Sequence, residues 1–214
     1  DLVAAELPAI RSRVRDFLAQ LRSEYPGRVV SVMSSLAEGA DRLVAEEAVG
    51  LRMPLTVVLP MPRHIYLADF ATQSSRLQFE QLCRAAVDVF ELPITPGNTP
   101  ASISDDPRNR ARQYAQVGVF LCAHCHILLA LWDGRESPQL GGTSQVVRFH
   151  HDDVMPGYTP RGAANRLVLT DDESDLVYHI VCSRDRPDGA PAAGLTPLTV
   201  SWFTTDEFEP RVAG

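Results

Sequence analysis

The chain has 214 residues, of which 45% are hydrophobic, and a chain of this length can bury one sizeable core, so we expect a single domain over residues 1–214. Its net charge of −7 excludes a general basic surface for nucleic acid, so no nucleic-acid partner is expected. All 20 basic residues are arginine, which excludes mechanisms that need a lysine, such as Schiff-base, Walker-type or Ser-Lys chemistry.

The composition favours a cytoplasmic setting. No apolar stretch approaches the roughly 20 residues that span a membrane, and no signal peptide is visible. Four cysteines in a chain of this length do not make a disulfide scaffold, which indicates a reducing compartment. The chain begins at Asp1 rather than at a methionine, so the presence of residues before Asp1 is left open.

Apolar spacing predicts helices and strands that alternate along the chain. The predicted helices cover residues 2–25, 41–50, 74–86, 108–123 and 142–150. The predicted strands cover residues 28–34, 55–59, 87–92, 126–132 and 176–182. This alternation is typical of an α/β fold, and we expect a Rossmann-like, doubly wound, mostly parallel sheet with helices on both faces.

Three segments between or after these elements have the composition of loops. Residues 93–107 contain four prolines, a glycine and an asparagine, and a loop of about 15 residues inside a domain tends to be functional or mobile. Residues 151–166 are also loop-like. The C-terminal segment from about residue 183 is rich in Pro, Gly and Ala, so we expect it to be flexible.

Small and polar residues follow the first predicted strand. The candidate ligand residues in this turn are Ser34, Ser35, Glu38, Gly39 and Asp41. The hydroxyls suit phosphate or ribose, the glycine admits close approach of the backbone, and the carboxylates suit ribose hydroxyls. The alternative is an ordinary connection in which Asp41 lies near a helix N-terminus and is favoured there by the helix dipole.

A second set of candidates follows the most apolar predicted strand. They are Asp133, Gly134, Gly141, Gly142 and Thr143. Asp133 lies at the C-terminal end of that strand, where doubly wound sheets bind ligands, although Asp-Gly is also a common turn pair. The Gly-Gly-Thr segment presents backbone N–H groups and a hydroxyl at a helix start, which suits phosphate; the alternative is a flexible entry capped by Thr143.

The two turns together predict one binding pocket. Two such turns in one α/β chain favour a nucleotide or phosphorylated ligand held between them. The residues expected along one rim are Ser35, Gly39, Asp133 and Gly142. We expect Asp133 and Thr143 to lie on the surface of this cleft.

Other polar groups have weaker claims to a function. Arg63 and Tyr66 follow the second predicted strand and are candidates to pair a phosphate and stack on a base; a solvated loop with anchoring aromatics is the alternative. Residues 122–126 hold two cysteines and two histidines, but no second ligand pair accompanies them, and we interpret them as buried small hydrophobic residues. The run His150–Asp153 is interpreted as a solvated helix end. No metal is expected, and no cofactor other than a nucleotide ligand.

Several of these segments, in this order, resemble the SLOG superfamily. They are Ser-Ser-Leu-Ala-Glu-Gly-Ala-Asp-Arg from Ser34, Leu-Thr-Val-Val-Leu-Pro-Met-Pro-Arg from Leu55, Ala-Leu-Trp-Asp-Gly from Ala130 and Gly-Gly-Thr from Gly141. That superfamily joins the Lonely-guy cytokinin-activating phosphoribohydrolases and the DNA-processing protein A-like fold. The resemblance covers about residues 28–147 and implies a Rossmann-like sheet whose two turns bind a nucleotide or a nucleotide-derived ligand.

Two departures from the family pattern bear on activity. The Lonely-guy enzymes carry Pro-Gly-Gly-x-Gly-Thr-x-x-Glu, and counting from Thr143 the place of the glutamate falls on Val146, which cannot transfer a proton. The family also begins with a strand that ends in Gly-His-Arg, whereas this chain opens in the helix that follows. That strand either lies upstream of Asp1 or is absent.

The leading hypothesis is therefore a nucleotide sensor without chemistry of its own. The resemblance implies a role in a bacterial conflict or defence system, beside an effector or membrane-protein partner. One alternative is an enzyme of the nucleotide N-glycosidase or phosphoribohydrolase type, with Glu38 or Asp133 as the acid–base candidates. Another is a non-catalytic scaffold domain, and the identity of the nucleotide and the oligomeric state are left open.

Overall fold

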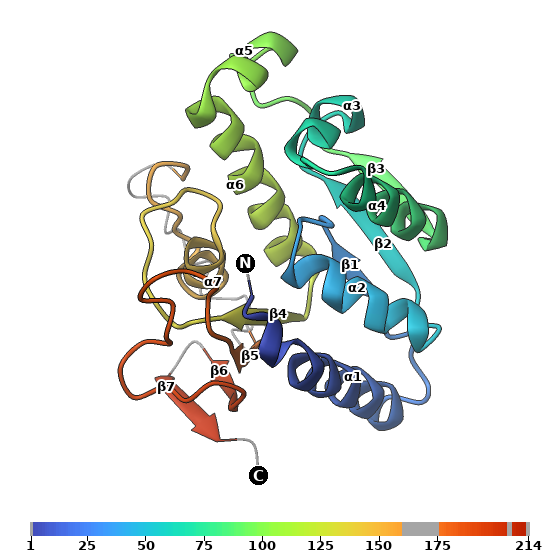
Figure 1. Cartoon of the computed structure of the whole chain (residues 1–214), viewed down its shortest axis with the longest axis vertical. Helices are drawn as coiled ribbons and strands as arrows, with labels where there is room; N and C mark the ends of the chain where they lie inside the picture. The colour runs from blue at the N-terminus through green and yellow to red at the C-terminus, as the bar shows by residue number, and fades with distance from the viewer. Residues whose placement is uncertain (1, 160–175, 205–206, 213–214) are drawn as a thin grey trace, which may run out of the picture. The chain divides into compact units, whose positions relative to one another are not determined.

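The computed structural model describes residues 2–159, 176–204 and 207–212. The chain is an α/β protein that divides into two compact units, residues 1–100 and 101–214. The strands of each unit form a sheet of their own (Figure 1).

The first unit is built on a parallel sheet in the order β1-β2-β3. Its strands are β1 (Val32–Ser34), β2 (Leu55–Leu59) and β3 (Asp88–Glu91). Its helices are α1 (Leu7–Glu24), α2 (Ala40–Gly50), α3 (Arg63–Tyr66) and α4 (Gln73–Ala85), with 3-10 turns η1 (Ala4–Glu6) and η2 (Leu67–Asp69). In register, Met33 lies opposite Thr56, and Val57 lies opposite Val89.

The core of this unit includes the apolar face of α1 and the central strand β2. Ile10, Val14 and Phe17 lie three or four residues apart on α1, and all three are buried. Every residue of β2 from Val57 to Leu59 is buried, as expected for a central parallel strand covered on both faces. Helix α2 packs on β1 and β2 and contacts α1 and α4, so it links the first turn to the rest of the unit (Figure 1).

Side chains cap two of the helices at their first turns. Thr72 precedes α4, and its Oγ1 accepts a hydrogen bond of 3.1 Å from the backbone N–H of Ser75. Asp106 precedes the long helix α6 (Pro107–His124) and accepts in the same way from Arg108 at 2.8 Å. A proline at the first position of α6 also suits a helix start, because that N–H has no helical partner in any case.

The second unit combines a parallel strand pair with an antiparallel extension. Its strands are β4 (Ile127–Trp132), β5 (Leu176–Val181), β6 (Val200–Thr204) and β7 (Glu207–Val212), and its helices are α5 (Pro100–Asp105, which begins at the unit boundary), α6 and α7 (Thr143–Asp152). The sheet order is β4-β5-β6-β7, with β4 and β5 parallel and the other two pairs antiparallel. Helix α7 packs against β4 and α6, and Ala130, Val147 and Val177 are buried together.

The five predicted strands and five predicted helices are all present. β2 has the predicted bounds, whereas β1 begins at Val32 rather than at residue 28. The prediction of an uninterrupted loop over residues 93–107 was wrong, because α5 forms inside it. Strands β6 and β7 were not predicted. The C-terminal segment from residue 183 contains turns with backbone hydrogen bonds, and its flexibility stays a prediction.

Candidate functional site

The first turn owes its shape to two left-handed backbone positions between β1 and α2. Leu36 has φ +57°, and Gly39, directly before α2, has φ +89° and ψ −116°. The conformation of Gly39 lies in a region that side-chain-bearing residues avoid, which explains the glycine. Gly39 is exposed, as is the neighbouring Glu38.

The polar groups predicted to bind a ligand in this turn bond to one another. Ser35 Oγ donates to the Asp41 carboxylate at 2.6 Å, and the backbone N–H groups of Ser35 and Ala37 also donate to it. Ser34 Oγ accepts from the N–H of Leu36 at 3.1 Å. Burial of the Asp41 carboxyl raises its pKa above the ordinary value, although these hydrogen bonds oppose the shift. The carboxylate therefore occupies the donors that the sequence suggested for a phosphate.

Tyr66 and Arg63 support the turn and α4 rather than extending into solvent. Tyr66 is fully buried, its hydroxyl donates to the carbonyl oxygen of Ser35 at 3.1 Å, and its ring packs edge-on against Phe70 with centroids 5.0 Å apart. The expectation that Tyr66 stacks on a base is therefore corrected, because the ring lies inside the unit. Arg63 forms an ion pair with Glu80 on α4.

A polar hollow of about 580 Å³ opens beside the first turn. It is lined by Glu38, Arg42, Ser74, Ser75 and Gln78. Arg42 is buried, and its Nε donates to the carbonyl oxygen of Leu36 at 3.0 Å. Of these five residues, only Glu38 was predicted from the sequence as a ligand residue. Arg42 lies three residues before the buried Ala45 on α2, and this spacing was the one available signal that it faces inward.

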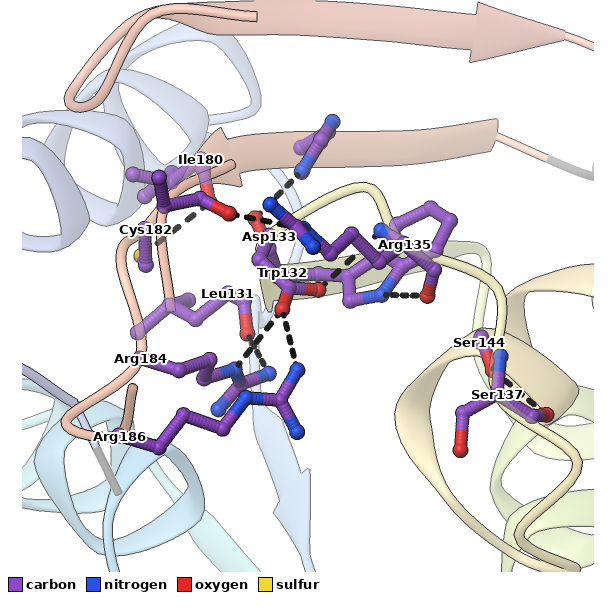
Figure 2. Close-up of polar contacts among 12 residues, drawn as sticks. Leu131, Trp132, Asp133, Arg135, Ser137, Ser144, Ile180, Cys182, Arg184 and Arg186 are labelled. Carbon is purple, nitrogen blue, oxygen red and sulfur yellow. Dashed lines mark hydrogen bonds and ion pairs between the residues drawn. The ribbon is translucent and has the colours of Figure 1, made fainter. Parts of the chain in front are cut away.

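In the second unit, Asp133 is buried at the end of β4 and held by cations. Figure 2 shows the side chains of Arg184 and Arg186 converging on its carboxylate, at 4.0 and 3.2 Å. The backbone N–H of Arg135 donates to the same carboxylate at 3.2 Å, and the carbonyl oxygen of Asp133 accepts from Ala192 at 2.8 Å. With an exposed fraction of 3%, Asp133 does not lie on the surface of a cleft, which corrects that expectation.

Gly134 and Gly141 are glycines for steric reasons. Gly134 has φ +74°, and a Cβ there would lie 2.2 Å from Leu195 Cδ1. Gly141 has φ +77°, and a Cβ there would lie 2.7 Å from the backbone nitrogen of Ala115. Both positions therefore combine a left-handed backbone with a close neighbour.

Helix α7 begins without a side-chain cap. Gly142 is the N-cap residue, no side-chain hydrogen bond caps it, and Thr143 is exposed at the first helical position. The N–H of Gly142 donates to the carbonyl oxygen of Gln139 and that of Gln145 to the carbonyl oxygen of Gly142, both at 3.0 Å, so the N–H groups of the first two helical residues are the ones suited to an anion. Close by, Ser144 Oγ and Gln145 Nε2 both donate to the carbonyl oxygen of Ser137, at 3.3 and 3.1 Å (Figure 2 shows the Ser137–Ser144 contact).

Val146, the residue that falls where the Lonely-guy motif has its glutamate, lies against a glycine of α6. Val146 packs on α6 at Gly118, where an added Cβ would lie 2.7 Å from Val146 Cγ2. The neighbouring Gln145 is buried, and its Oε1 accepts no hydrogen bond from the described residues. Neither side chain supplies a proton donor or acceptor of the carboxyl type at this place.

The cysteines and histidines at residues 122–126 and 150–151 differ in burial from what the sequence predicts. Only Cys122 of residues 122–126 is buried; Cys125 is half-buried, and His124 and His126 are exposed. His150 and His151 are buried, so the solvated helix end proposed for them was wrong, because this end of α7 turns inward. Burial lowers the pKa of His150, which favours the neutral imidazole. Within the described ranges, no three His, Cys, Asp or Glu side chains gather as a metal site.

The candidate residues form one group in each unit. Ser34, Ser35, Glu38, Gly39 and Asp41 belong to the first unit, and Asp133, Gly134, Gly141, Gly142 and Thr143 belong to the second. Their expected meeting along one rim stays a prediction. No protein-family model matches the chain, and no curated protein matches its sequence. In the part of the chain that the structure describes, no helix has the length and apolar character needed to cross a bilayer.

Proposed function

We propose that the chain binds a nucleotide or a nucleotide-derived ligand and acts as a sensor. The observation that carries this proposal is the start of α7, where Gly142 provides no side-chain cap and Thr143 stands exposed. Backbone N–H groups at such a start attract a phosphate through hydrogen bonds and the helix dipole. Thr143 adds one hydroxyl donor beside them.

The wider arrangement is part of the same proposal. We place this phosphate site in a Rossmann-like, doubly wound sheet in which the first turn contributes to the same ligand, as the SLOG resemblance implies. We assign the protein to the cytoplasm of a bacterium, where it would pass the binding event to an effector or membrane-protein partner. The hydroxyls and carboxylates of the first turn support this, since they match the polar parts of a nucleoside.

The valine at the place of the Lonely-guy glutamate favours binding without turnover. Val146 packs on Gly118, and an apolar side chain there cannot assist cleavage of an N-glycosidic bond. Asp133, the second acid–base candidate, is engaged by Arg186 and by the N–H of Arg135. Any contact of this carboxylate with a substrate would first require exchange of those partners.

A binding assay on the full chain tests this function. Mononucleotides, NAD, ADP-ribose and cyclic dinucleotides are titrated by calorimetry, and each mixture is then analysed by chromatography for products. We expect at least one phosphorylated compound to bind and none to be consumed. Steady turnover would refute the sensor, and failure of the whole panel to bind would refute the proposal altogether.

Thr143→Ala is the variant that tests the assigned site. Loss of a hydrogen bond to a charged group costs about 1.5–3 kcal/mol, so we expect affinity to fall roughly 10- to 150-fold. Thr196→Ala is the matched control, because Thr196 is an exposed threonine of the same unit. Its backbone carbonyl oxygen, which the substitution keeps, accepts the hydrogen bond from Thr199 Oγ1. If Thr143→Ala binds with wild-type affinity, the assignment of the start of α7 to the ligand site is wrong.

A further inference from the structure

The hollow beside the first turn has a balanced set of polar groups. Its lining comes from the turn and α2 (Glu38 and Arg42) and from α4 (Ser74, Ser75 and Gln78), all within the first unit. One carboxylate, one guanidinium, two hydroxyls and one amide leave it with no net charge. Such a set favours a neutral ligand group that both donates and accepts hydrogen bonds over an apolar group or an anion.

Arg42 lines this hollow and carries a donor with no acceptor in the part of the chain that the structure describes. The side chain is only 2% exposed, and its guanidinium lies 4.2 Å from the centroid of the Phe70 ring. Nη1 donates to the carbonyl oxygen of Ser75 at 2.9 Å and to Gln78 Oε1 at 3.1 Å. Nη2 is buried and has no hydrogen-bond acceptor among the described residues. A buried donor of a charged group without an acceptor is costly, which points to an acceptor supplied from outside.

Glu38 supplies acceptors at the same place. Its side chain is exposed and accepts from Ser75 Oγ, which leaves further lone pairs on the carboxylate. Its negative charge acts on Arg42, opposing the lowering of that pKa by burial. Gln78 cannot take the part of Glu38, because its Nε2 already donates to Glu46 at 2.6 Å while its Oε1 accepts from Arg42.

We propose that this hollow binds the vicinal diol of a sugar, with Glu38 accepting from both hydroxyls and Arg42 Nη2 donating to one of them. Each hydroxyl of a diol donates once and accepts, so the pair matches one carboxylate and one spare N–H. A phosphate fits less well, because its charge would stand against Glu38. The inference rests on the proposed function in that the sugar is taken to be the ribose of the nucleotide.

A sugar probe without base or phosphate separates this inference from the proposed function. Methyl β-D-ribofuranoside is titrated into the ¹⁵N-labelled full chain, and its 2-deoxy counterpart, which lacks the diol, is titrated in parallel. We expect millimolar binding, with shifts of the Arg42 Nε signal and of the Glu38 and Ser75 amides, and at least a tenfold weaker response to the deoxy sugar. Equal responses to the two sugars, or no shift at millimolar concentration, would overturn the diol site whether or not nucleotides bind.

Glu38→Gln tests the role of the carboxylate without threatening the fold, because the side chain is exposed. It should abolish the difference between the two sugars. Glu24→Gln, at an exposed carboxylate of the same unit, is the control and should keep that difference. In the nucleotide panel, a 2′,3′-dideoxynucleotide that binds as well as its parent would refute the diol site and leave the proposed function standing.

Discussion

At the scale of single residues, the Asp41 carboxylate holds the first turn from inside. It accepts from Ser35 Oγ at 2.6 Å and from backbone N–H groups of the turn. An aspartate two residues after a turn that contains serines and a glycine looks the same in the sequence whether its carboxylate binds a ligand or binds the turn itself. Only the left-handed positions at Leu36 and Gly39 bring the carboxylate back onto the backbone.

This buried carboxyl predicts a pH-dependent contribution to stability. Burial raises the folded-state pKa of Asp41 above its ordinary value of 3.8, so the folded state favours the protonated form. The stability contributed by Asp41 is therefore fully present below pH 3.8 and is lost as the pH rises through the folded pKa. Relative to the non-titrating variant Asp41→Asn, the free energy of unfolding of the wild type should fall over that interval. Urea denaturation of both proteins across acid pH measures the difference, and a difference that rises with pH would contradict this account.

Asp133 shows how far residue types alone define a site. Its place at the end of β4 was predicted, but its partners Arg184 and Arg186 come from the segment after β5, more than 50 positions away. Nothing in the local pattern indicates those contacts. An alanine at position 133 would leave two arginines without their carboxylate, so Thr143 is the cleaner position at which to test ligand binding.

At the scale of elements, the presence or absence of flanking prolines and other local signals decided which helices and strands could be predicted. β2 matched its predicted bounds because Pro54 and Pro60 flank five apolar or β-branched residues. α5 was missed because a six-residue helix inside a proline-rich stretch has too little periodicity to detect. β6 and β7 follow a segment of turns; β6 depends on pairing with β5 and β7 on pairing with β6, and no local signal reveals either pairing.

The approach to α7 provides a steric prediction at this scale. A Cβ on Gly141 would lie 2.7 Å from the Ala115 nitrogen at φ +77°, whereas Gly157 has φ +85° and nothing within 4 Å of an added Cβ. Gly157→Ala should therefore cost only the left-handed strain of about 1–2 kcal/mol. Gly141→Ala should cost about 1–3 kcal/mol more, because the close neighbour is backbone. Urea midpoints of the two variants decide this, and equal losses would show that the chain relaxes around Gly141.

At the scale of the whole molecule, the sequence predicts one domain, whereas the contacts divide the chain into two compact units. The two descriptions differ in what they imply for unfolding. Both tryptophans, Trp132 and Trp202, belong to the second unit, so their fluorescence follows that unit, while far-UV circular dichroism follows the helices of both. A chain that folds as one domain gives coincident transitions by the two methods.

We expect the two transitions to coincide and to shift together in Gly141→Ala, although the substitution lies in the second unit. For a chain of this size, each kcal/mol lost should lower the melting temperature by about 2–4 °C. The measurement is thermal unfolding of wild type and variant followed by both methods, with calorimetry to compare the calorimetric and van't Hoff enthalpies. A dichroism component that keeps its wild-type midpoint in Gly141→Ala would show that residues 1–100 unfold on their own. In that case the first turn and its hollow would belong to an independent module, and ligand binding there would stabilise that module alone.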